Sequence, residues 1–229
     1  MKCLNTIHKC DLLVARQGFG CQLMAGFPKT LKRCLDLMIA VPAGLLLSPL
    51  MLLIAVAIKL TSRGPVFFQH RRIGRDEVPF SAWKFRTMVS DADTILAERL
   101  AANPALREEW QRDHKLRNDP RVTPVGAVLR KFSLDELPQL WNVIRSEMSI
   151  VGPRPISLEE IAKYAEYFDD YCSVLPGITG LWQVSGRCET AYQERVRLDA
   201  YYVNNWSLWL DVYIIAQTVR VVISARGAY

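Results

Sequence analysis

The stretch LMIAVPAGLLLSPLMLLIAVAI, from Leu37 to Ile58, contains 22 residues and no charged side chain. As a straight α-helix it would be about 33 Å long, which is enough to cross the hydrocarbon core of a bilayer. The alternative is a buried core helix, but core helices rarely run this long without a charge. We therefore expect this stretch to lie in a membrane.

Two prolines interrupt the apolar stretch, and Ser48-Pro49 lies at its centre. Proline removes a backbone donor and bends a helix, and the Ser48 hydroxyl could bond a freed carbonyl. The basic residues on its two flanks are Lys29, Lys32 and Arg33, then Lys59, Arg63, Arg71, Arg72 and Arg75. Because positive charge marks the cytoplasmic side, both ends are expected on one face. The sequence therefore favours a re-entrant helix-break-helix over a plain span.

The remaining chain predicts an α+β fold that is mainly helical, with short strands and amphipathic helices. The expected strands are at 65–68 and 80–85, and the expected helices at 91–115 (interrupted near Pro104), 137–144, 158–171, 191–204 and 206–225. A turn-rich loop is expected at 176–180. The predicted domains are a poorly ordered extension at 1–28, the re-entrant membrane helix at 29–62 and a globular cytosolic domain at 63–229.

Composition indicates an anionic partner. The chain has 29 Lys and Arg against 23 Asp and Glu, a formal net charge of +6. Nucleic acid, phosphorylated small molecules or an anionic membrane face would fit this charge. No nucleic acid is expected, because the basic residues alternate with acids and a membrane segment intervenes. The six cysteines include no C-x-x-C pair and the three histidines are scattered, so no zinc site is expected and the thiols are expected to be reduced.

Two interpretations of Ser133-Leu134-Asp135-Glu136 stay open. The pattern S-x-x-E is that of a helix capping box, although Pro138 follows closely. Alternatively, Asp135 lies near a helix N-terminus, which attracts phosphate. Adjacent carboxylates suit a magnesium site or an aspartate nucleophile attacking phosphorus. They do not suit a glycosidase, whose two acids flank the bond that they cleave.

Other segments carry groups suited to phosphate. In Val151–Pro155, two prolines hold Arg154 on a stiff loop. The segment from Pro176 to Arg187 contains three glycines and offers stacking, amide and guanidinium contacts through Trp182, Gln183 and Arg187. Lys84 and Asp211 are further candidates; Asp211 is an acid in an apolar run, which needs a partner or a function.

Together these segments resemble the bacterial sugar transferases, the small monotopic polyprenyl-phosphate sugar-1-phosphate transferases. The matching stretches are 84–88 (KFRTM), 133–140 (SLDELPQL), 148–155 (MSIVGPRP), 176–184 (PGITGLWQV) and 206–211 (WSLWLD). The resemblance covers about residues 31–229. His70 departs from it, standing where the family usually has Gln, and Ser146-Glu147 stands where Gly-Asp is usual.

The resemblance implies that the chain moves a hexose-1-phosphate, galactose or glucose, from a UDP-sugar to undecaprenyl phosphate and releases UMP. This would begin exopolysaccharide or glycoconjugate synthesis on the cytoplasmic face of the bacterial inner membrane. Asp135 would form the covalent phosphosugar intermediate, and Glu136 would help it to hold Mg²⁺. The further implied site residues are Lys84, Arg130 and Asp211 as catalytic, Arg154, Gly180, Gln183 and Arg187 as substrate-binding, and Ser48-Pro49 as the membrane break.

The implied partners are therefore a UDP-sugar, undecaprenyl phosphate and inner-membrane lipid, and a homodimer is compatible with the sequence. A membrane-anchored basic scaffold without catalysis is the rival hypothesis. It predicts no UMP release from UDP-sugar, Mg²⁺ and undecaprenyl phosphate.

Overall fold

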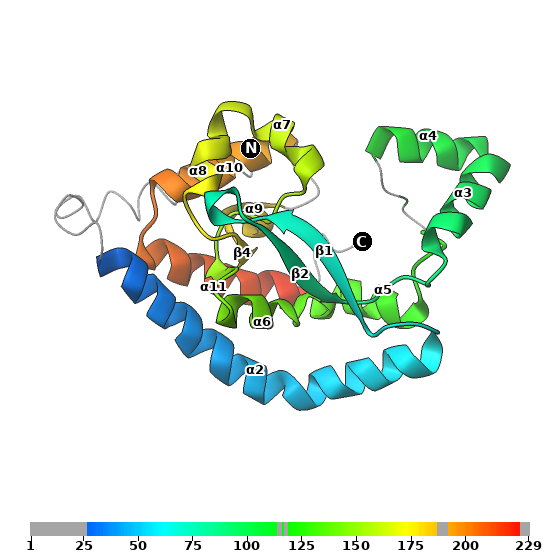
Figure 1. Ribbon diagram of the computed structural model, residues 1–229, viewed down its shortest axis with the longest axis horizontal. Helices are drawn as coiled ribbons and strands as arrows, with labels where there is room; N and C mark the ends of the chain where they lie inside the picture. Colours follow the sequence, from blue (N-terminus) through cyan, green and yellow to red (C-terminus); the bar gives the residue numbers. More distant parts are fainter. Residues whose placement is uncertain (1–26, 114–115, 117–118, 187–191, 225–229) are drawn as a thin grey trace. The chain divides into compact units, whose positions relative to one another are not determined.

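The computed structural model describes residues 27–113, 116, 119–186 and 192–224 (Figure 1). The helices are α2 (Phe27–Thr61), α3 (Ala92–Ala102), α4 (Pro104–Asp113), α5 (Pro124–Lys131), α6 (Gln139–Ile144), α7 (Ile161–Tyr164), α8 (Phe168–Cys172), α9 (Leu181–Ser185), α10 (Tyr192–Asn204) and α11 (Leu208–Ser224). The strands are β1 (Phe67–Ile73), β2 (Pro79–Phe85), β3 (Ser149–Val151) and β4 (Gly177–Thr179). The protein is thus mainly helical with a few short strands, as predicted.

The described residues divide into two compact units. The large unit comprises the described parts of Met1–Leu47, Gln69–Trp83 and Pro138–Gly227, and the small unit comprises those of Ser48–Phe68 and Lys84–Leu137. The division cuts α2 between Leu47 and Ser48. Of the extension expected at 1–28, residues 1–26 lie outside the described residues, and Phe27 and Pro28 begin α2.

Helix α2 is one continuous element of 35 residues that includes Pro42, Ser48 and Pro49. Among the described helices it is the one that is long and apolar enough to cross a membrane, by length and composition. Only 11% of its apolar window is buried, which excludes the alternative of a buried core helix. The helix is compatible with a membrane anchor, and its topology remains a prediction.

Polar contacts dock the first part of α2 within the large unit. The Asp36 carboxylate accepts hydrogen bonds from the Ser149 hydroxyl and the Ile150 backbone N–H, both at 2.9 Å. The Arg33 guanidinium donates to the carbonyls of Val143 and Ile144 at the end of α6, at 2.7 and 3.0 Å. Arg33 therefore binds a helix C-terminus, where cations are favourable, and is weaker evidence for membrane orientation than the sequence suggested.

The core of the large unit surrounds the parallel pair of strands β3 and β4. The pair aligns Ser149 with Gly177 and Val151 with Thr179. Its buried apolar residues are Ala40, Phe80, Ala82, Val143, Met148, Ile150, Val151, Leu181, Trp182, Leu198, Tyr202, Leu210 and Ile214. Strand β4 replaces the turn-rich loop expected at 176–180, because both short strands are buried and their backbone groups pair with each other.

The small unit has its own apolar core, in which Ile54 and Ile58 of α2 pack with Phe85 and Leu129. Within this unit α5 lies directly on the chain after β2. A Cβ at Gly126 would clash with the Thr87 carbonyl, so glycine permits this close approach. The glycine thereby sets the position of the helix that precedes the Asp-Glu pair.

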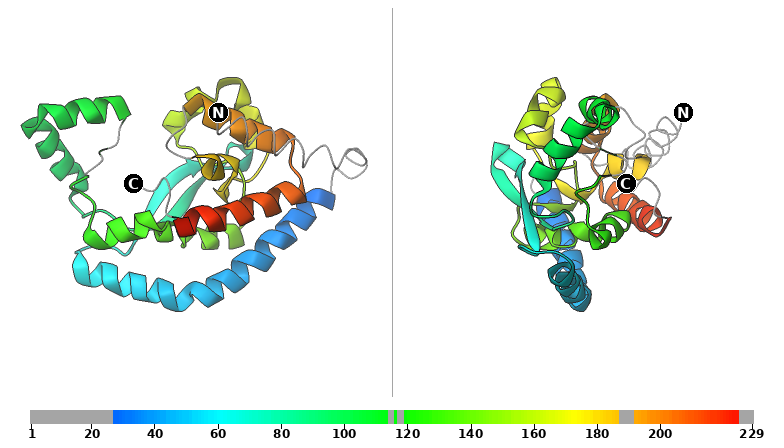
Figure 2. Two further views of the ribbon diagram at one scale, coloured as in Figure 1. Left: turned by 180° about the vertical axis from the view of Figure 1, so that it is seen from behind. Right: turned by 90° about the vertical axis from the view of Figure 1, so that its right-hand side faces the viewer.

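Most predicted helices are confirmed with small shifts. The helix expected at 158–171 and the bounds of the strand expected at 65–68 are wrong. The interruption near Pro104 separates α3 from α4 (Figure 2). The single helix expected at 158–171 is instead broken into α7 and α8, since Ala165 has a positive φ of 44°. The strand expected at 65–68 begins at Phe67 and continues to Ile73.

Candidate functional site

The Asp-Glu pair lies in the small unit, on a short 3₁₀ turn (Leu134–Glu136) that follows α5. Thr123 caps α5 by accepting the Gly126 backbone N–H at 2.9 Å. Ser133 then takes a left-handed backbone conformation, with φ of 55°, and makes no side-chain cap hydrogen bond. The capping-box interpretation of Ser133 and Glu136 is therefore wrong. The sharp turn at Ser133 instead directs the chain into the two acids.

Two cations and two carboxylates meet at this turn. The Lys84 ammonium, at the end of β2, donates to Glu136 Oε1 at 2.6 Å. The Arg130 Nε–H, near the end of α5, donates to Thr87 Oγ1 at 2.9 Å, and its charge acts on Asp135. The structure thus brings together four of the residues singled out in the sequence, Lys84, Arg130, Asp135 and Glu136. Their catalytic roles stay predictions. Thr87 was missed because nothing in its local pattern distinguishes it.

Burial and, second, the charge of the neighbouring Glu136 raise the pKa of the Asp135 carboxyl from 3.8 to about 6. Lys84 and Arg130 oppose this rise but do not cancel it. Burial also lowers the pKa of Arg130, and Asp135 partly restores it. Asp135 is thus a carboxylate whose charge the protein itself does not fully compensate. Such perturbed groups are concentrated at functional sites.

The residues at this turn fit a magnesium ion that a phosphate ligand helps to hold. No group of three or more His, Cys, Asp or Glu side chains that could bind a metal occurs within the described ranges. Mg²⁺ usually takes only one or two protein carboxylates, with phosphate oxygens and water completing its shell. The repulsion between Asp135 and Glu136 is what a divalent cation would relieve. These two residues would hold it.

A second charged cluster lies in the large unit and was largely missed from the sequence. The Glu160 carboxylate accepts hydrogen bonds from the Ser157 backbone N–H (2.8 Å), Arg195 (3.0 Å), Arg72 (3.1 Å) and the Tyr192 hydroxyl (3.2 Å). Burial alone would raise its pKa, but the Ser157 N–H and the arginines lower it to about 2. The Ser157-x-x-Glu160 spacing is a sequence signal for one of these contacts; nothing local marked the arginines.

Arg154 belongs to the same cluster. Its guanidinium lies 5.5 Å from the Trp182 ring centre, and that of Arg195 lies 5.1 Å from it. The charges of Arg154 and Arg195, after burial, lower the pKa of Arg72. Three mutually repelling arginines therefore gather around two carboxylates, Glu160 and Asp199, which leaves local positive charge for an anion. Arg187, predicted to bind substrate, lies outside the described residues.

The remaining predicted site residues have structural contacts in the large unit. The Asp211 carboxylate accepts from Lys32 (2.7 Å), the Tyr202 hydroxyl (2.8 Å) and the Trp206 indole N–H (3.1 Å), so the structure supplies the partners that its apolar surroundings require. These bonds tie α2 to α10 and α11 (Figure 2). A Cβ at Gly180 would clash with the Gly152 carbonyl.

The glycines at 152, 177 and 180 thus let two backbone segments pack together. Gln183 lies in α9, next to Trp182, and Ser48 and Pro49 are exposed within α2. The binding roles of Gly180 and Gln183, the catalytic role of Asp211 and the membrane break at Ser48-Pro49 stay predictions.

Comparison with known proteins places this geometry in context. The model of a family described as "Bacterial sugar transferase" matches residues 27–225. The "Exopolysaccharide production protein ExoY" of Sinorhizobium fredii is 50% identical over 198 residues, which cover 86% of this chain and 88% of the relative.

Two longer relatives have names that describe an activity. The "Undecaprenyl-phosphate galactose phosphotransferase" of Salmonella typhimurium is 46% identical over 199 residues, 87% of this chain and 42% of the relative. The "UDP-glucose:undecaprenyl-phosphate glucose-1-phosphate transferase" of Escherichia coli is 39% identical over 215 residues, 90% of this chain and 43% of the relative. This chain therefore spans less than half the length of these two proteins.

Proposed function

This chain is an enzyme of the bacterial sugar transferase family, and we propose that it transfers a hexose-1-phosphate from a UDP-sugar to undecaprenyl phosphate through an intermediate on Asp135. The observation that carries the proposal is the partly buried Asp135 carboxyl, which is crowded by Glu136 and flanked by two cations, Lys84 and Arg130. Such a carboxylate can attack a phosphorus atom, and the neighbouring cations can bind the oxygens of the same phosphate.

The reaction has two steps at one phosphorus atom. First, a carboxylate oxygen of Asp135 bonds to the sugar-bearing phosphorus of the UDP-sugar, and the bond from that phosphorus to the bridging oxygen breaks. UMP leaves with the electron pair. Second, a phosphate oxygen of undecaprenyl phosphate bonds to the same phosphorus and the bond to Asp135 breaks. The products are the undecaprenyl diphosphate sugar and the regenerated carboxylate. One site thus serves the donor and the acceptor in turn.

The charged neighbours of Asp135 have distinct roles in this proposal. Lys84 holds Glu136 through their 2.6 Å contact, and Arg130 keeps positive charge close to Asp135. Both lower the free energy of the ionised nucleophile and attract the phosphates. Mg²⁺ bound by Asp135 and Glu136 would neutralise the diphosphate and stabilise the leaving UMP. Arg154 would contact the nucleotide-sugar, since local positive charge is in excess around it. Gln183 and Arg187, from the later segment 176–187, are the other proposed contacts.

Membrane attachment through α2 is part of the proposal. The acceptor is a lipid, so an enzyme held at the cytoplasmic face of the inner membrane can meet its headgroup. We propose that α2 enters one leaflet and returns, bending at Ser48-Pro49, since proline favours a bend and basic residues lie at both ends. Cysteines substituted for Lys29 and Arg63 should both resist a membrane-impermeant reagent added from the periplasm. Labelling of one alone would contradict this topology.

The sugar is proposed to be galactose or glucose, because relatives of both specificities match over most of this chain. UMP release should be measured across a panel of UDP-sugars with undecaprenyl phosphate and Mg²⁺. We expect one of these two hexoses to give the highest kcat/KM. A markedly higher value for another UDP-sugar would contradict this choice.

The intermediate has a direct test. The protein is mixed with UDP-sugar labelled in the sugar and no acceptor, and UMP and bound label are counted. We expect a burst close to one UMP per enzyme and label that maps to the peptide carrying Asp135. Release of UMP only when acceptor is present, with no bound label, would contradict the covalent mechanism. No UMP under any condition would favour the non-catalytic scaffold.

A further inference from the structure

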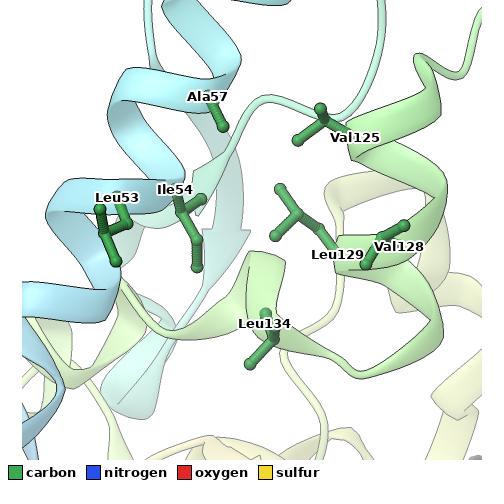
Figure 3. A pocket seen from close by; sticks show the side chains of 7 residues that line it. All are labelled: Leu53, Ile54, Ala57, Val125, Val128, Leu129 and Leu134. Carbon is green, nitrogen blue, oxygen red and sulfur yellow. The ribbon is translucent and has the colours of Figure 1, made fainter.

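An apolar groove lies in the small unit between α2 and α5 (Figure 3). Figure 3 shows side chains of α2 on one side facing those of α5 on the other, with Leu134 below them. The lining residues are Leu53, Ile54 and Ala57 from α2, Val125, Val128 and Leu129 from α5, and Leu134. All seven are aliphatic, and the groove has a volume of about 320 Å³.

The groove has a buried floor and an open, apolar rim. Ile54 and Leu129 are 7% and 3% exposed and belong to the core of the small unit. Leu53 and Val128, in contrast, are 67% and 54% exposed. The rim is therefore continuous with the exposed apolar surface of α2, where Leu52 and Val56 also lie open. Apolar surface of this kind is stable in contact with hydrocarbon and costly in water.

One end of the groove adjoins, along the chain, the turn that carries the candidate catalytic residues. Leu134 lines the groove, and the next two residues in the same 3₁₀ turn are Asp135 and Glu136. The cations Lys84 and Arg130 lie at this turn through their interactions with the two acids. The surface thus changes within one residue from aliphatic to charged. A molecule that complements it has a hydrocarbon chain and an anionic head.

We propose that this groove holds the first isoprene units of the polyprenyl phosphate acceptor, with the phosphate directed toward Asp135. The inference rests on the proposed function and adds where the acceptor's tail binds. The volume lies at the lower end of the range for ligand sites, so the groove takes only the start of the chain and the rest stays in the bilayer. Branched isoprene units fill a groove of aliphatic side chains better than a linear chain does, because packing density governs such contacts.

Two variants test the groove and one serves as a matched control. Ala57→Phe fills it. Leu53→Ala removes part of its rim and leaves the buried core intact, because Leu53 is 67% exposed. Leu52→Ala is the control, since Leu52 is the adjacent residue, has the same type and the same 67% exposure, and does not line the groove. Any general loss of membrane affinity should affect the two alanine variants alike.

The measurement is the KM for a medium-length polyprenyl phosphate, compared with a linear alkyl phosphate of equal carbon number, in nanodiscs. We expect Ala57→Phe and Leu53→Ala to raise the KM for the isoprenoid about tenfold, and Leu52→Ala to leave it within about twofold. The wild type should prefer the isoprenoid, and the groove variants should reduce that preference. Equal effects of Leu53→Ala and Leu52→Ala, or equal use of both acceptors by the wild type, would overturn the proposal.

Failure of this inference can be told apart from failure of the proposed function. UMP release in the absence of acceptor reports only the first step and does not involve the groove's occupant. If the wild type releases no UMP, the function is wrong. If it does so but the acceptor KM is unchanged in Ala57→Phe, the function stands and the groove holds something else, such as an ordinary lipid acyl chain.

Discussion

Glu160 in the large unit and Asp135 in the small unit are both carboxylates among basic side chains, yet the protein treats them in opposite ways. Glu160 accepts five hydrogen bonds from four neighbours, two of them from Ser157, and its pKa falls to about 2. Asp135 is partly buried beside another acid, and its pKa rises to about 6. The difference has identifiable causes: burial and the Glu136 charge raise the pKa of Asp135, whereas the Ser157 N–H and the arginines lower the pKa of Glu160.

The comparison separates a carboxylate that serves the fold from one that is kept for a ligand. A buried network of hydrogen-bonded ion pairs holds its helices and loops together, and removing one member lowers the free energy of unfolding. A carboxylate left partly uncompensated makes the folded protein less stable, and such costs persist where function requires them. We therefore expect substitutions at the two positions to have opposite effects on stability and on activity.

Asp135→Asn should give the largest effect, a loss of about 10⁴-fold or more in kcat. The amide cannot act as the nucleophile, so neither the UMP burst nor the covalent label should appear. The variant should at the same time be more stable at pH 7, by about 2–3 kcal/mol. The folded protein binds the Asp135 proton more tightly than the unfolded chain does, so ionisation between pH 3.8 and about 6 lowers the free energy of unfolding.

Urea denaturation in detergent and UMP assays measure both quantities on one preparation. Asp93→Asn is a suitable control, because it changes the same type of residue in the exposed first turn of α3. An active Asp135→Asn protein would remove this residue from the chemistry. An inactive but destabilised one would show that Asp135 contributes to the fold as Glu160 does.

Glu160→Gln should reduce the free energy of unfolding by about 3 kcal/mol, because Arg72, which is 13% exposed, loses the carboxylate that it pairs with, and Arg195, which is 7% exposed, keeps only Asp199 at 3.8 Å. The pKa of Glu160 is lowered in the fold, so its contribution is present above pH 4.5 and is lost as pH falls toward 2. The stability difference between wild type and variant should therefore shrink over that window. A difference that is independent of pH would show that the lost contact is not ionic.

The pH dependence of the first step should distinguish the nucleophile from the structural acid. At limiting Mg²⁺, kcat/KM should fall about tenfold per pH unit below 6, because only the Asp135 carboxylate reacts. Raising the Mg²⁺ concentration should move this fall in kcat/KM to lower pH, since a bound cation favours the ionised form of Asp135. Measurement of UMP release from pH 5 to 8 at several Mg²⁺ concentrations checks both. If the pH at which kcat/KM falls does not change with Mg²⁺ concentration, this would argue against metal binding at Asp135 and Glu136.

The sequence predicted the long apolar helix α2, the position of the Asp-Glu pair beside Lys84 and Arg130, and the chain order of most helices, because long apolar stretches and ordered motifs are local signals. It did not predict β3 and β4, whose three residues each pair across 25 intervening residues. It also did not predict the close approach of Gly177 and Gly180 to Gly152, because this approach is a tertiary contact.

The site was predicted unevenly for the same reason. Lys84, Asp135 and Glu136 belong to motifs, Arg130 lies just before one, and the structure brings the four together. Arg195 and Glu160 form an ion pair 3.0 Å long between α10 and the turn before α7, and no local pattern joins positions so far apart. Sequence motifs thus located the acid with uncompensated charge more readily than the saturated one.

The smallest effects concern two serines with left-handed backbones. Ser133, with φ of 55°, precedes the Asp-Glu turn in the small unit, and Ser146, with φ of 65°, lies after α6 in the large unit. Glycine adopts this conformation without the steric cost of a Cβ, so Ser133→Gly and Ser146→Gly should each gain about 1 kcal/mol in the free energy of unfolding. Ser146→Ala keeps the Cβ and should gain nothing.

Only Ser133→Gly should alter catalysis, with kcat lower by about threefold to tenfold, because its turn fixes the direction in which Asp135 leaves α5. Thermal denaturation and the UMP burst on the same three variants test this. Equal activity of the two glycine variants would mean that the backbone at Ser133 does not position the nucleophile. The left-handed backbone at Ser133 would then only lower the free energy of unfolding, as the one at Ser146 does.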